Sequence, residues 1–214
     1  MKIKLLFAIA FLLSAFLIVG CSKDENPSDN NEDANYFPLT IGNSWTFLVY
    51  ETDTAGTDTF VEVQSIVNDT IVADSSLWYV MHSTVEDSIT DSSYYRKDTV
   101  YGYLYVRYFY SSVALDVIAS KLNPQVNDDW EQYDTIMGII YVHIYGKVEA
   151  REDITVPAGV FDCFKERLDI QISGAMRDTV VMNNWLSNNV GPVRIFQTSA
   201  TDTTDMKLQA YSVH

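Results

Sequence analysis

Apolar and polar residues alternate with a period of two through most of the chain after residue 44. In one such stretch, Ile140, Val142 and Ile144 occupy every second position. Tyr141 and His143 occupy the positions between them. Side chains point to opposite faces only in an extended strand, so this pattern predicts a strand with one dry face and one mixed face.

Similar runs predict about ten strands, at 45–51, 57–67, 76–86, 92–97, 99–110, 136–148, 161–172, 178–186, 191–199 and 205–213. Only residues 112–122, followed by Pro124, have the spacing of a short helix, and this segment can also form a strand. Short connections favour antiparallel pairing. We therefore expect an all-β (mainly β) domain with one large curved antiparallel sheet, as a half-barrel, a barrel or a sandwich, with at most one short helix.

The N-terminus combines a positive start with a short apolar run. Leu5–Val19 is 15 residues long, which is less than the roughly 20 residues of a membrane-spanning helix, so it predicts a signal peptide. Ile18-Val19-Gly20-Cys21 resembles the bacterial lipobox, whose cysteine is joined to diacylglycerol before cleavage. The resemblance implies a signal peptide at 1–20 and lipid attachment at Cys21. The alternative is an ordinary secretory peptide with an incidental cysteine.

A polar segment follows Cys21. It is rich in Asp, Asn and Glu and contains no large apolar residue, so it predicts a flexible acidic stalk. We assign residues 21–35 to the lipidated cysteine and stalk, and 36–214 to a single β-rich domain. Lys23-Asp24-Glu25 resembles the export signal of Bacteroidetes-type surface lipoproteins, which implies the outer membrane and the cell surface. The alternative is an anchor that faces the periplasm.

Charge and motif content exclude several functions. Removing residues 1–20 takes away Lys2 and Lys4 and no acids, so the formal charge changes from −15 to −17. This charge disfavours nucleic acid as a partner. The sequence contains no G-x-G, H-E-x-x-H, C-x-x-C or G-x-S-x-G motif. We therefore predict no cofactor, no metal site and no catalytic residue.

Cys163 is the only cysteine besides Cys21, so the sequence offers no internal disulfide once Cys21 is lipidated. The alternation of its strand places it with Lys165 and Arg167. We interpret Cys163 as a half-buried strand residue, with a reactive thiol as the alternative.

The triplet of Asp, then Ser or Thr, then a small or apolar residue recurs along the chain, and we consider the seven copies that begin at Asp53, Asp69, Asp87, Asp98, Asp134, Asp178 and Asp202. Asp and Ser/Thr side chains bond to nearby backbone groups, so the triplet predicts hairpin corners. It also resembles the O-glycosylation acceptor of Bacteroides-type exported proteins. That resemblance implies candidate sugar sites at Thr70, Ser88, Thr99, Thr135 and Thr179.

A tyrosine row is the most unusual local feature. Tyr101, Tyr103 and Tyr105 fall on one face of a predicted strand. Exposed, they would offer flat amphipathic area to sugar rings or to a protein partner. Buried, they would fill the core of the sheet.

Three sequence blocks, Tyr36–Leu39 with Gly42–Trp45, Val156–Cys163, and Val190–Val193, look like a family of poorly characterised bacterial lipoproteins. That family shares a "YFPL..G..W" opening, a "V.AG.F" turn and a "GVG.V" strand. The resemblance implies an all-β fold similar to the half-barrels of periplasmic lipoprotein carriers, and it supplies no active residue.

Details of these blocks carry further expectations. Gly159 and Gly191 are expected where the backbone needs freedom or close approach. Pro192 predicts an edge or bulged strand. Residues 41–45 are echoed by 126–130, which we interpret as a recurrent turn leading into a strand, with a duplication as the alternative.

We expect a lipid-anchored, non-enzymatic binding or assembly module of the cell envelope. Its partners would be the membrane, through the anchor, and a glycan, an acyl chain or a protein. One alternative is a glycosidase-like surface hydrolase with paired carboxylates. The pairs Asp128-Asp129 and Glu152-Asp153 are instead interpreted as solvated turns. The other alternative is a purely structural surface protein.

Overall fold

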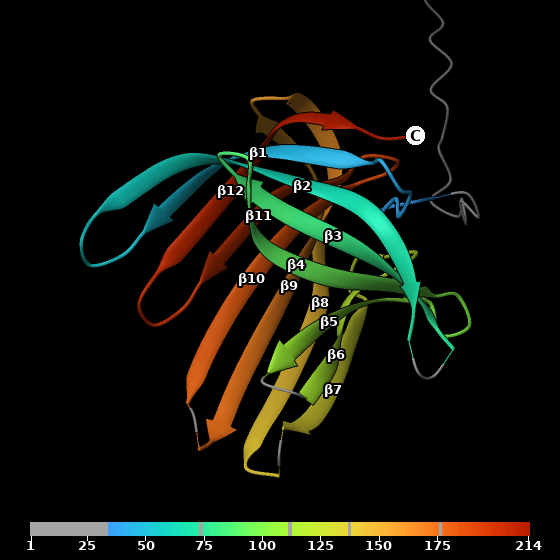
Figure 1. Ribbon diagram of the computed structural model, residues 1–214, viewed down its shortest axis with the longest axis vertical. Helices are drawn as coiled ribbons and strands as arrows, with labels where there is room; N and C mark the ends of the chain where they lie inside the picture. Colours follow the sequence, from blue (N-terminus) through green and yellow to red (C-terminus); the bar gives the residue numbers. More distant parts are fainter. Residues whose placement is uncertain (1–33, 73–74, 111–112, 137, 176) are drawn as a thin grey trace, which may run out of the picture. The chain divides into compact units, whose positions relative to one another are not determined.

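The computed structural model describes residues 34–72, 75–110, 113–136, 138–175 and 177–214. The predicted signal peptide, Cys21 and most of the predicted stalk lie outside these residues. The described chain forms a single twelve-stranded antiparallel sheet in the order β6-β5-β4-β3-β2-β1-β12-β11-β10-β9-β8-β7 (Figure 1). The strands are β1 (Ser44–Thr52), β2 (Thr57–Ile71), β3 (Leu77–Val85), β4 (Ser88–Asp98), β5 (Tyr103–Tyr110), β6 (Val113–Lys121), β7 (Asp129–Ile136), β8 (Ile140–Val156), β9 (Gly159–Gly174), β10 (Asp178–Ser187), β11 (Gly191–Thr198) and β12 (Thr203–Ser212).

The prediction of an all-β, antiparallel, barrel-like sheet is confirmed. The short helix allowed at 112–122 is wrong, because Val113–Lys121 forms strand β6. Pairing with β5 along its length decides the conformation of this segment. Among the described residues there is no helix long and apolar enough to cross a membrane.

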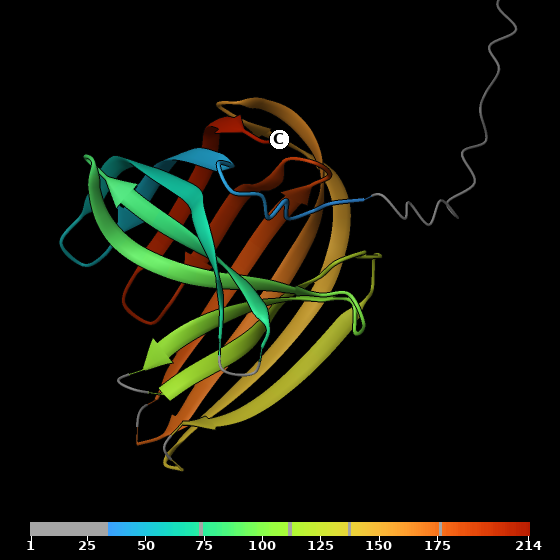
Figure 2. The ribbon, with the colours of Figure 1, turned by 45° about the vertical axis from the view of Figure 1, so that its right-hand side comes forward.

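The sheet curls until its two edge strands, β6 and β7, meet through side chains. Gln132 on β7 accepts the backbone N–H of Ile118 at 2.8 Å and donates to the backbone oxygen of Asp116 at 2.6 Å. Trp130 Nε1 donates to the Ile118 oxygen at 3.2 Å. The side-chain amide of Gln132 thus accepts one hydrogen bond and donates another to β6, as a backbone peptide group of a paired strand does. We call this junction the β6–β7 seam; Figure 2 shows the two strands diverging from it.

Two matching turns begin the two halves of the sheet, β1–β6 and β7–β12. Gly42 and Asn127 both have positive φ, 95° and 76°. The N–H of Gly42 donates to the oxygen of Ile66, and that of Asn127 to the oxygen of Val148, each at 2.9 Å. A bulge follows both acceptors, in β2 and in β8. The echoed motif is therefore a turn leading into a strand, as interpreted.

The core consists of two apolar clusters. The larger joins both halves around Trp45, Phe47 and Leu208, none of which is exposed. The second packs Leu115 of β6 and its neighbours against the dry face of β8, with Ile144 at its centre. The dry and mixed faces predicted for this part of β8 are confirmed.

Because antiparallel strands alternate in direction, their connections fall at two ends of the sheet. We call the end at which β1 begins the proximal end. It holds residues 34–43 and the β2–β3, β4–β5, β6–β7, β8–β9 and β10–β11 connections. The distal end holds the β1–β2, β3–β4, β5–β6, β7–β8, β9–β10 and β11–β12 connections.

The three sequence blocks meet at the proximal end. Trp45 Nε1 donates to the oxygen of Val190 at 2.6 Å, and a Cβ on Gly191 would lie 3.2 Å from that nitrogen. The N–H of Ala158 donates to the oxygen of Leu208 at 2.9 Å, which places the β8–β9 turn against β12. The blocks are therefore structural, and they close one end of the sheet.

Several local predictions can be compared with this end. Gly159 and Gly191 have φ of 138° and 95°, as expected for positions that need backbone freedom. The bulge at Pro192 is confirmed, because the β10–β11 register shifts there. The edge position is wrong, because β11 lies between β10 and β12. The interpretation of Cys163 as half-buried is wrong: it is 1% exposed, because its side chain packs in the larger apolar cluster.

Four of the seven Asp triplets mark turns, as predicted. Asp53 accepts the N–H groups of Ala55 and Gly56, and Asp98 accepts those of Val100 and Tyr101. The triplets that begin at Asp87 and Asp202 also lie at turns. The triplets that begin at Asp69, Asp134 and Asp178 lie within strands. The pair Glu152-Asp153 is also within a strand, β8, and the turn predicted for it is wrong.

Candidate functional site

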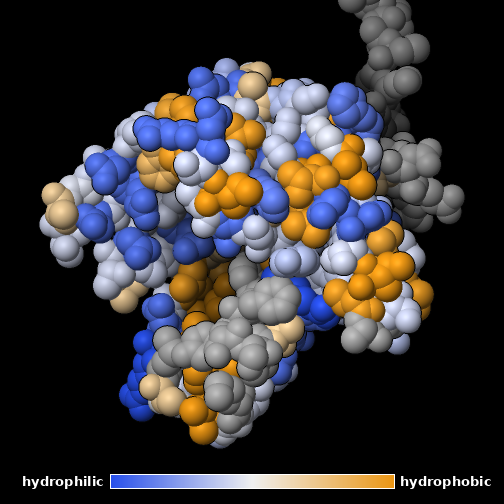
Figure 3. Space-filling view, viewed as in Figure 1, coloured by the Kyte–Doolittle hydropathy of each residue, from blue (hydrophilic) through white to orange (hydrophobic). Residues whose placement is uncertain are grey.

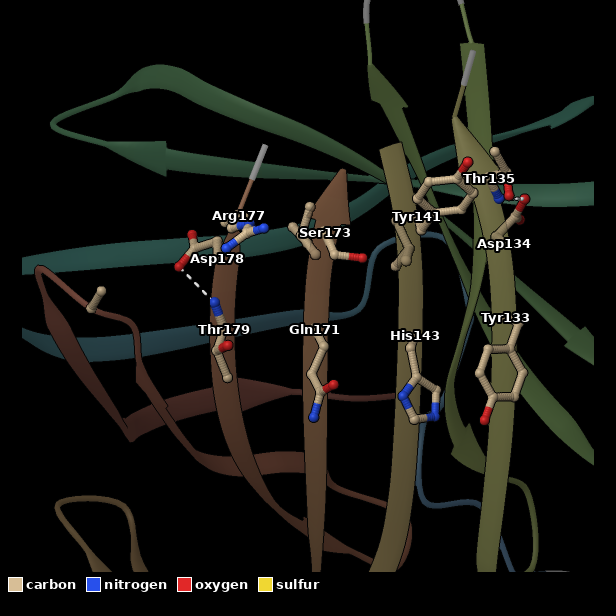
Figure 4. A pocket seen from close by; sticks show the side chains of 13 residues that line it. Tyr133, Asp134, Thr135, Tyr141, His143, Gln171, Ser173, Arg177, Asp178 and Thr179 are labelled. Atoms are coloured by element: carbon tan, nitrogen blue, oxygen red, sulfur yellow. Dashed lines mark hydrogen bonds between the residues drawn. The ribbon is translucent and has the colours of Figure 1, made fainter. Parts of the chain in front are cut away.

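The strongest candidate site is an open groove of about 840 Å³ on the mixed face of β7–β10, towards the distal end (Figure 4). The β11–β12 connection contributes Ala200 to its rim. The other lining residues are Tyr133, Asp134, Thr135, Tyr141, Val142, His143, Gln171, Ile172, Ser173, Arg177, Asp178 and Thr179.

Strand register arranges the groove's side chains in two rows across the sheet. The first row is Tyr133, His143, Gln171 and Thr179, each paired with the next on the neighbouring strand. Strands lie about 4.8 Å apart, so four of them span roughly 14 Å. In Figure 4 these four side chains lie side by side across the sheet.

The second row lies nearer the distal end. It contains Thr135, Tyr141 and Ser173, which are paired in the same way. The mixed face of β8 supplies one aromatic ring to each row because the aliphatic positions between them face the core.

A stacked pair of rings fixes the shape of the groove at β7 and β8. The rings of Tyr133 and His143 are parallel within 1°, with centroids 4.3 Å apart. Both side chains hydrogen-bond to Glu131 Oε1 at 2.7 Å. The bonds from Tyr133 and then His143 lower the pKa of Glu131, and the bond to Glu131 raises the pKa of Tyr133. The carboxylate therefore holds two exposed rings in one orientation.

The two aspartates of the groove are each bonded to the backbone of the following residue. Asp134 Oδ1 accepts the N–H of Thr135 at 2.7 Å, and Asp178 Oδ1 accepts that of Thr179 at 2.8 Å. Arg177 supplies a positive charge beside Asp178 in the same lining. Within the described residues no three His, Cys, Asp or Glu side chains are placed to hold a metal ion.

The structure keeps Tyr103 and Tyr105 together on β5, with ring centroids 6.4 Å apart, and separates Tyr101 from them. Tyr101 lies in the β4–β5 turn, not on a strand, because Asp98 closes that turn. Tyr103 packs partly against the second cluster, and the guanidinium of Arg96 lies 4.7 Å from the ring of Tyr105. None of the three lines the groove, and ligand binding by them stays a prediction.

The candidate sugar sites are also spread over the molecule. Thr135 and Thr179 are exposed and line the groove. Ser88 and Thr99 are exposed elsewhere, and Thr70 is half-buried in β2. Their modification stays a prediction, as does lipid attachment at Cys21, which lies outside the described residues.

Sequence reasoning missed the groove as a site. Tyr133 belongs to β7, for which the turn at 126–130 predicted a strand but the alternation of side chains gave no range. A signal was present, because the mixed face of β8 carries Tyr141 and His143 opposite a fully aliphatic face. What the sequence does not contain is the register that sets Gln171 and Thr179 beside them.

Comparison with known proteins finds one matching family model and two similar solved structures. A family model described as DUF3108-like matches residues 126–211, which begin at the repeated turn and cover β7–β11 and nearly all of β12. No curated protein shows significant similarity to the chain.

Two solved structures resemble the whole sheet. One is described as a "putative lipoprotein" from Parabacteroides distasonis ATCC 8503, with TM-score 0.50 and 18% identity. The other is described as a "putative exported protein with YmcC-like fold" from Bacteroides fragilis NCTC 9343, with TM-score 0.51 and 16% identity. Each comparison covers 84% of this chain and 99% of the other. At these identities the likeness shows a shared fold and nothing more.

Proposed function

We propose that this protein is a lipoprotein of the bacterial cell envelope that binds a neutral saccharide in the β7–β10 groove. The lipobox at Cys21 and the descriptions of the two similar structures support the envelope location. The two rows of side chains across the groove carry the proposal for the ligand.

The chemistry of the groove fits a sugar. The C–H face of a pyranose ring packs on aromatic rings, and its hydroxyls need both donors and acceptors. Tyr133 and Tyr141 are 70% and 53% exposed, and so offer ring faces to a ligand. Gln171, Ser173 and Thr179 offer amide and hydroxyl groups beside them. The first row is long enough for two or three sugar units.

Charge narrows the class of saccharide. The mature chain carries a formal charge of −17, and the groove holds Arg177 together with two aspartates. Such a field repels uronic acids, sialic acids and phosphorylated glycans. A neutral glycan is not repelled by this charge.

The hydrogen bonding of the groove's acids supports binding without catalysis. A general acid or base needs a carboxyl group that can reach the substrate's proton. Asp134 and Asp178 each use one oxygen in a bond to the backbone N–H of the next residue, and Glu131, beside the groove, uses one in bonds to the Tyr133–His143 ring pair. These bonds favour a supporting role for the three carboxylates.

Binding is tested with the purified chain from residue 22 onward and with neutral gluco-, manno- and galacto-oligosaccharides of two to six units. We expect weak binding by calorimetry and chemical-shift changes at the groove. Tyr133→Ala should weaken binding by roughly three- to tenfold, since an aromatic contact contributes about 0.5–1.5 kcal/mol.

Tyr211→Ala is the matched control, because Tyr211 on β12 is 45% exposed and does not line the groove. The proposal is refuted if none of these sugars binds, or if Tyr133→Ala and Tyr211→Ala have equal effects.

The envelope location is tested separately by the intact mass of native protein. A mass that begins at Cys21 with a diacylglyceryl group is expected. The same spectrum reveals sugar on Thr135 or Thr179, which would fill the groove with the protein's own glycan. An unmodified thiol at residue 21 would refute the anchor.

A further inference from the structure

Exposed apolar side chains gather in the connections of the proximal end. The β4–β5 turn presents Val100 and Tyr101, which are 84% and 73% exposed. The β2–β3 hairpin presents Ile71 and Leu77, at 72% and 43%. We call these four residues the apolar tips. Val126 in the β6–β7 connection is also exposed at this end.

The two hairpins that carry the apolar tips lie at the same edge of the molecule. Tyr79 of β3 pairs with Tyr95 of β4, so Leu77 and the start of the β4–β5 turn both lie just beyond that pair. Figure 1 shows both hairpins on the right-hand side. In Figure 3, drawn from the same direction, apolar surface lies where Figure 1 places the β2–β3 hairpin.

The described connections of the distal end are different. Asp53 closes the β1–β2 turn with two backbone bonds. Ser199, Thr201 and Asp202 form a polar network in the β11–β12 turn. Large exposed apolar side chains in and beside the described parts of these turns are Ile139, Ile89 and Tyr141. Each of these three belongs to a different connection or strand end, whereas the apolar tips come in pairs on two neighbouring hairpins.

The chain enters the domain beside the apolar tips. Asn35 is held by Lys97 Nζ, which donates to its side-chain oxygen at 2.6 Å, and by the side chain of Asn188 at 2.8 Å. Lys97 immediately precedes Asp98, the first residue of the β4–β5 turn network. The segment from Cys21 to Asp33 has 13 residues, so it reaches at most about 45 Å.

We propose that the proximal end rests on the membrane surface, with the apolar tips inserted between the lipid headgroups. This rests on the lipid attachment at Cys21 put forward above, since a tether of this length keeps the domain at high local concentration near the bilayer. Aliphatic and tyrosine side chains are suited to the headgroup region. A zwitterionic surface fits the acidic chain, and the carboxylate of Asp98 is bonded to Arg96 at 3.2 Å and to two backbone N–H groups.

This orientation has a consequence for the groove. Because the groove lies towards the distal end, it faces away from the bilayer and is open to saccharides in solution.

The test uses residues 22–214 with an N-terminal hexahistidine, bound to nickel-chelating lipid in phosphatidylcholine vesicles. The tether is thus supplied independently of Cys21. Cys163 is buried, so a maleimide dye reacts only with an introduced cysteine. An environment-sensitive dye is placed at Val100→Cys, and at Ile139→Cys as the matched control in a distal turn.

We expect the dye at position 100 to brighten at least twofold on vesicle binding and to be quenched by nitroxide-labelled lipid. The dye at position 139 should change in neither respect. Equal responses at the two positions, or none at position 100, would overturn the proposed orientation. Neither result would bear on Cys21 or on the groove, which the mass spectrum and the sugar titration test.

A second measurement removes the apolar tips. Without the tether, the variant Ile71→Ser/Val100→Ser/Tyr101→Ser should partition into phosphatidylcholine vesicles at least tenfold less than the parent. The control Ile89→Ser/Ile139→Ser removes exposed residues outside the proximal end and should partition like the parent. Equal loss in both variants would show general hydrophobic adsorption and contradict the proposal.

Discussion

Replacing Glu166 by glutamine should remove a large part of the pH dependence of stability. Glu166 lies inside the sheet on β9 and has no exposed surface. Its Oε1 accepts a bond from Ser120 at 2.9 Å, while its Oε2 has no partner within the described residues. The side-chain oxygen of Asn184, its cross-strand neighbour on β10, has none there either. A proton on Glu166 would allow these two oxygens to share a hydrogen bond.

Burial raises the pKa of Glu166 from 4.5 to about 8, against the opposing bonds from Ser120 and the backbone of Lys121. The folded state therefore holds a proton that the unfolded state releases between pH 4.5 and 8. The stability contributed by this group is fully present below pH 4.5, falls as the pH rises, and is lost above pH 8. One pKa unit is 1.36 kcal/mol, so the full fall is about 5 kcal/mol, of which about 3.4 kcal/mol has occurred at pH 7.

Glutamine has the shape of the protonated acid and no charge to bury. At pH 9, the free energy of unfolding of Glu166→Gln should exceed that of the wild type by up to about 5 kcal/mol. At pH 4.5, the two free energies of unfolding should agree within about 1 kcal/mol. Urea titrations followed by tryptophan fluorescence at pH 4.5, 7 and 9 measure the difference. Glu51→Gln, an exposed change on β1, is the control. Parallel stability curves for wild type and Glu166→Gln would refute the reasoning.

Three further predictions concern packing, reactivity and the seam. A Cβ on Gly146 would lie 2.1 Å from the Trp130 ring, so Gly146→Ala should cost about 1–3 kcal/mol in chemical denaturation, and an unchanged midpoint would contradict this packing. Burial raises the pKa of the Cys163 thiol to about 12, so at pH 7.5 a disulfide reagent should react with it only in denaturant; rapid reaction of the native protein would show the thiol to be accessible. Gln132→Ala removes two bonds across the seam and should cost about 1–3 kcal/mol and speed hydrogen exchange at the Ile118 amide, whereas unchanged exchange would mean that Gln132 does not close it.

The fold class could be predicted because the strand period is written directly in the sequence. Ile140, Val142 and Ile144 fall on a buried face, and the turn chemistry of Asp53 and Asp98 ends strands where expected. Local pattern was sufficient for long strands such as β8, in which buried and exposed positions alternate over many residues.

Local sequence pattern gave wrong predictions where contacts between residues far apart in the sequence determine the backbone conformation. Residues 113–121 carry helical spacing, yet pairing with β5 makes them a strand. Glu152 and Asp153 look like a turn because they are charged, but they lie mid-strand, where Glu152 accepts the indole N–H of Trp185 at 2.7 Å.

The groove could be predicted least. Its rows depend on which residues oppose each other across four strands, and a shift of one residue in register would send Gln171 to the other face. Register is set by bulges and by the β8–β9 turn, neither of which can be read from side-chain alternation. The tyrosine row at 101–105 could be predicted only because its members lie close together in the sequence.

The pairing of β1 with β12 has a consequence for how the chain reaches its final state. These strands are the first and the last to be made, and their ladder alone gives the two halves a continuous backbone connection within the described sheet. A chain still emerging from the ribosome therefore cannot join its halves until β12 (Thr203–Ser212) has been made. The topology makes the joining of the two halves a late event in folding, because the other eleven strands of the described sheet are made before the strand that connects them.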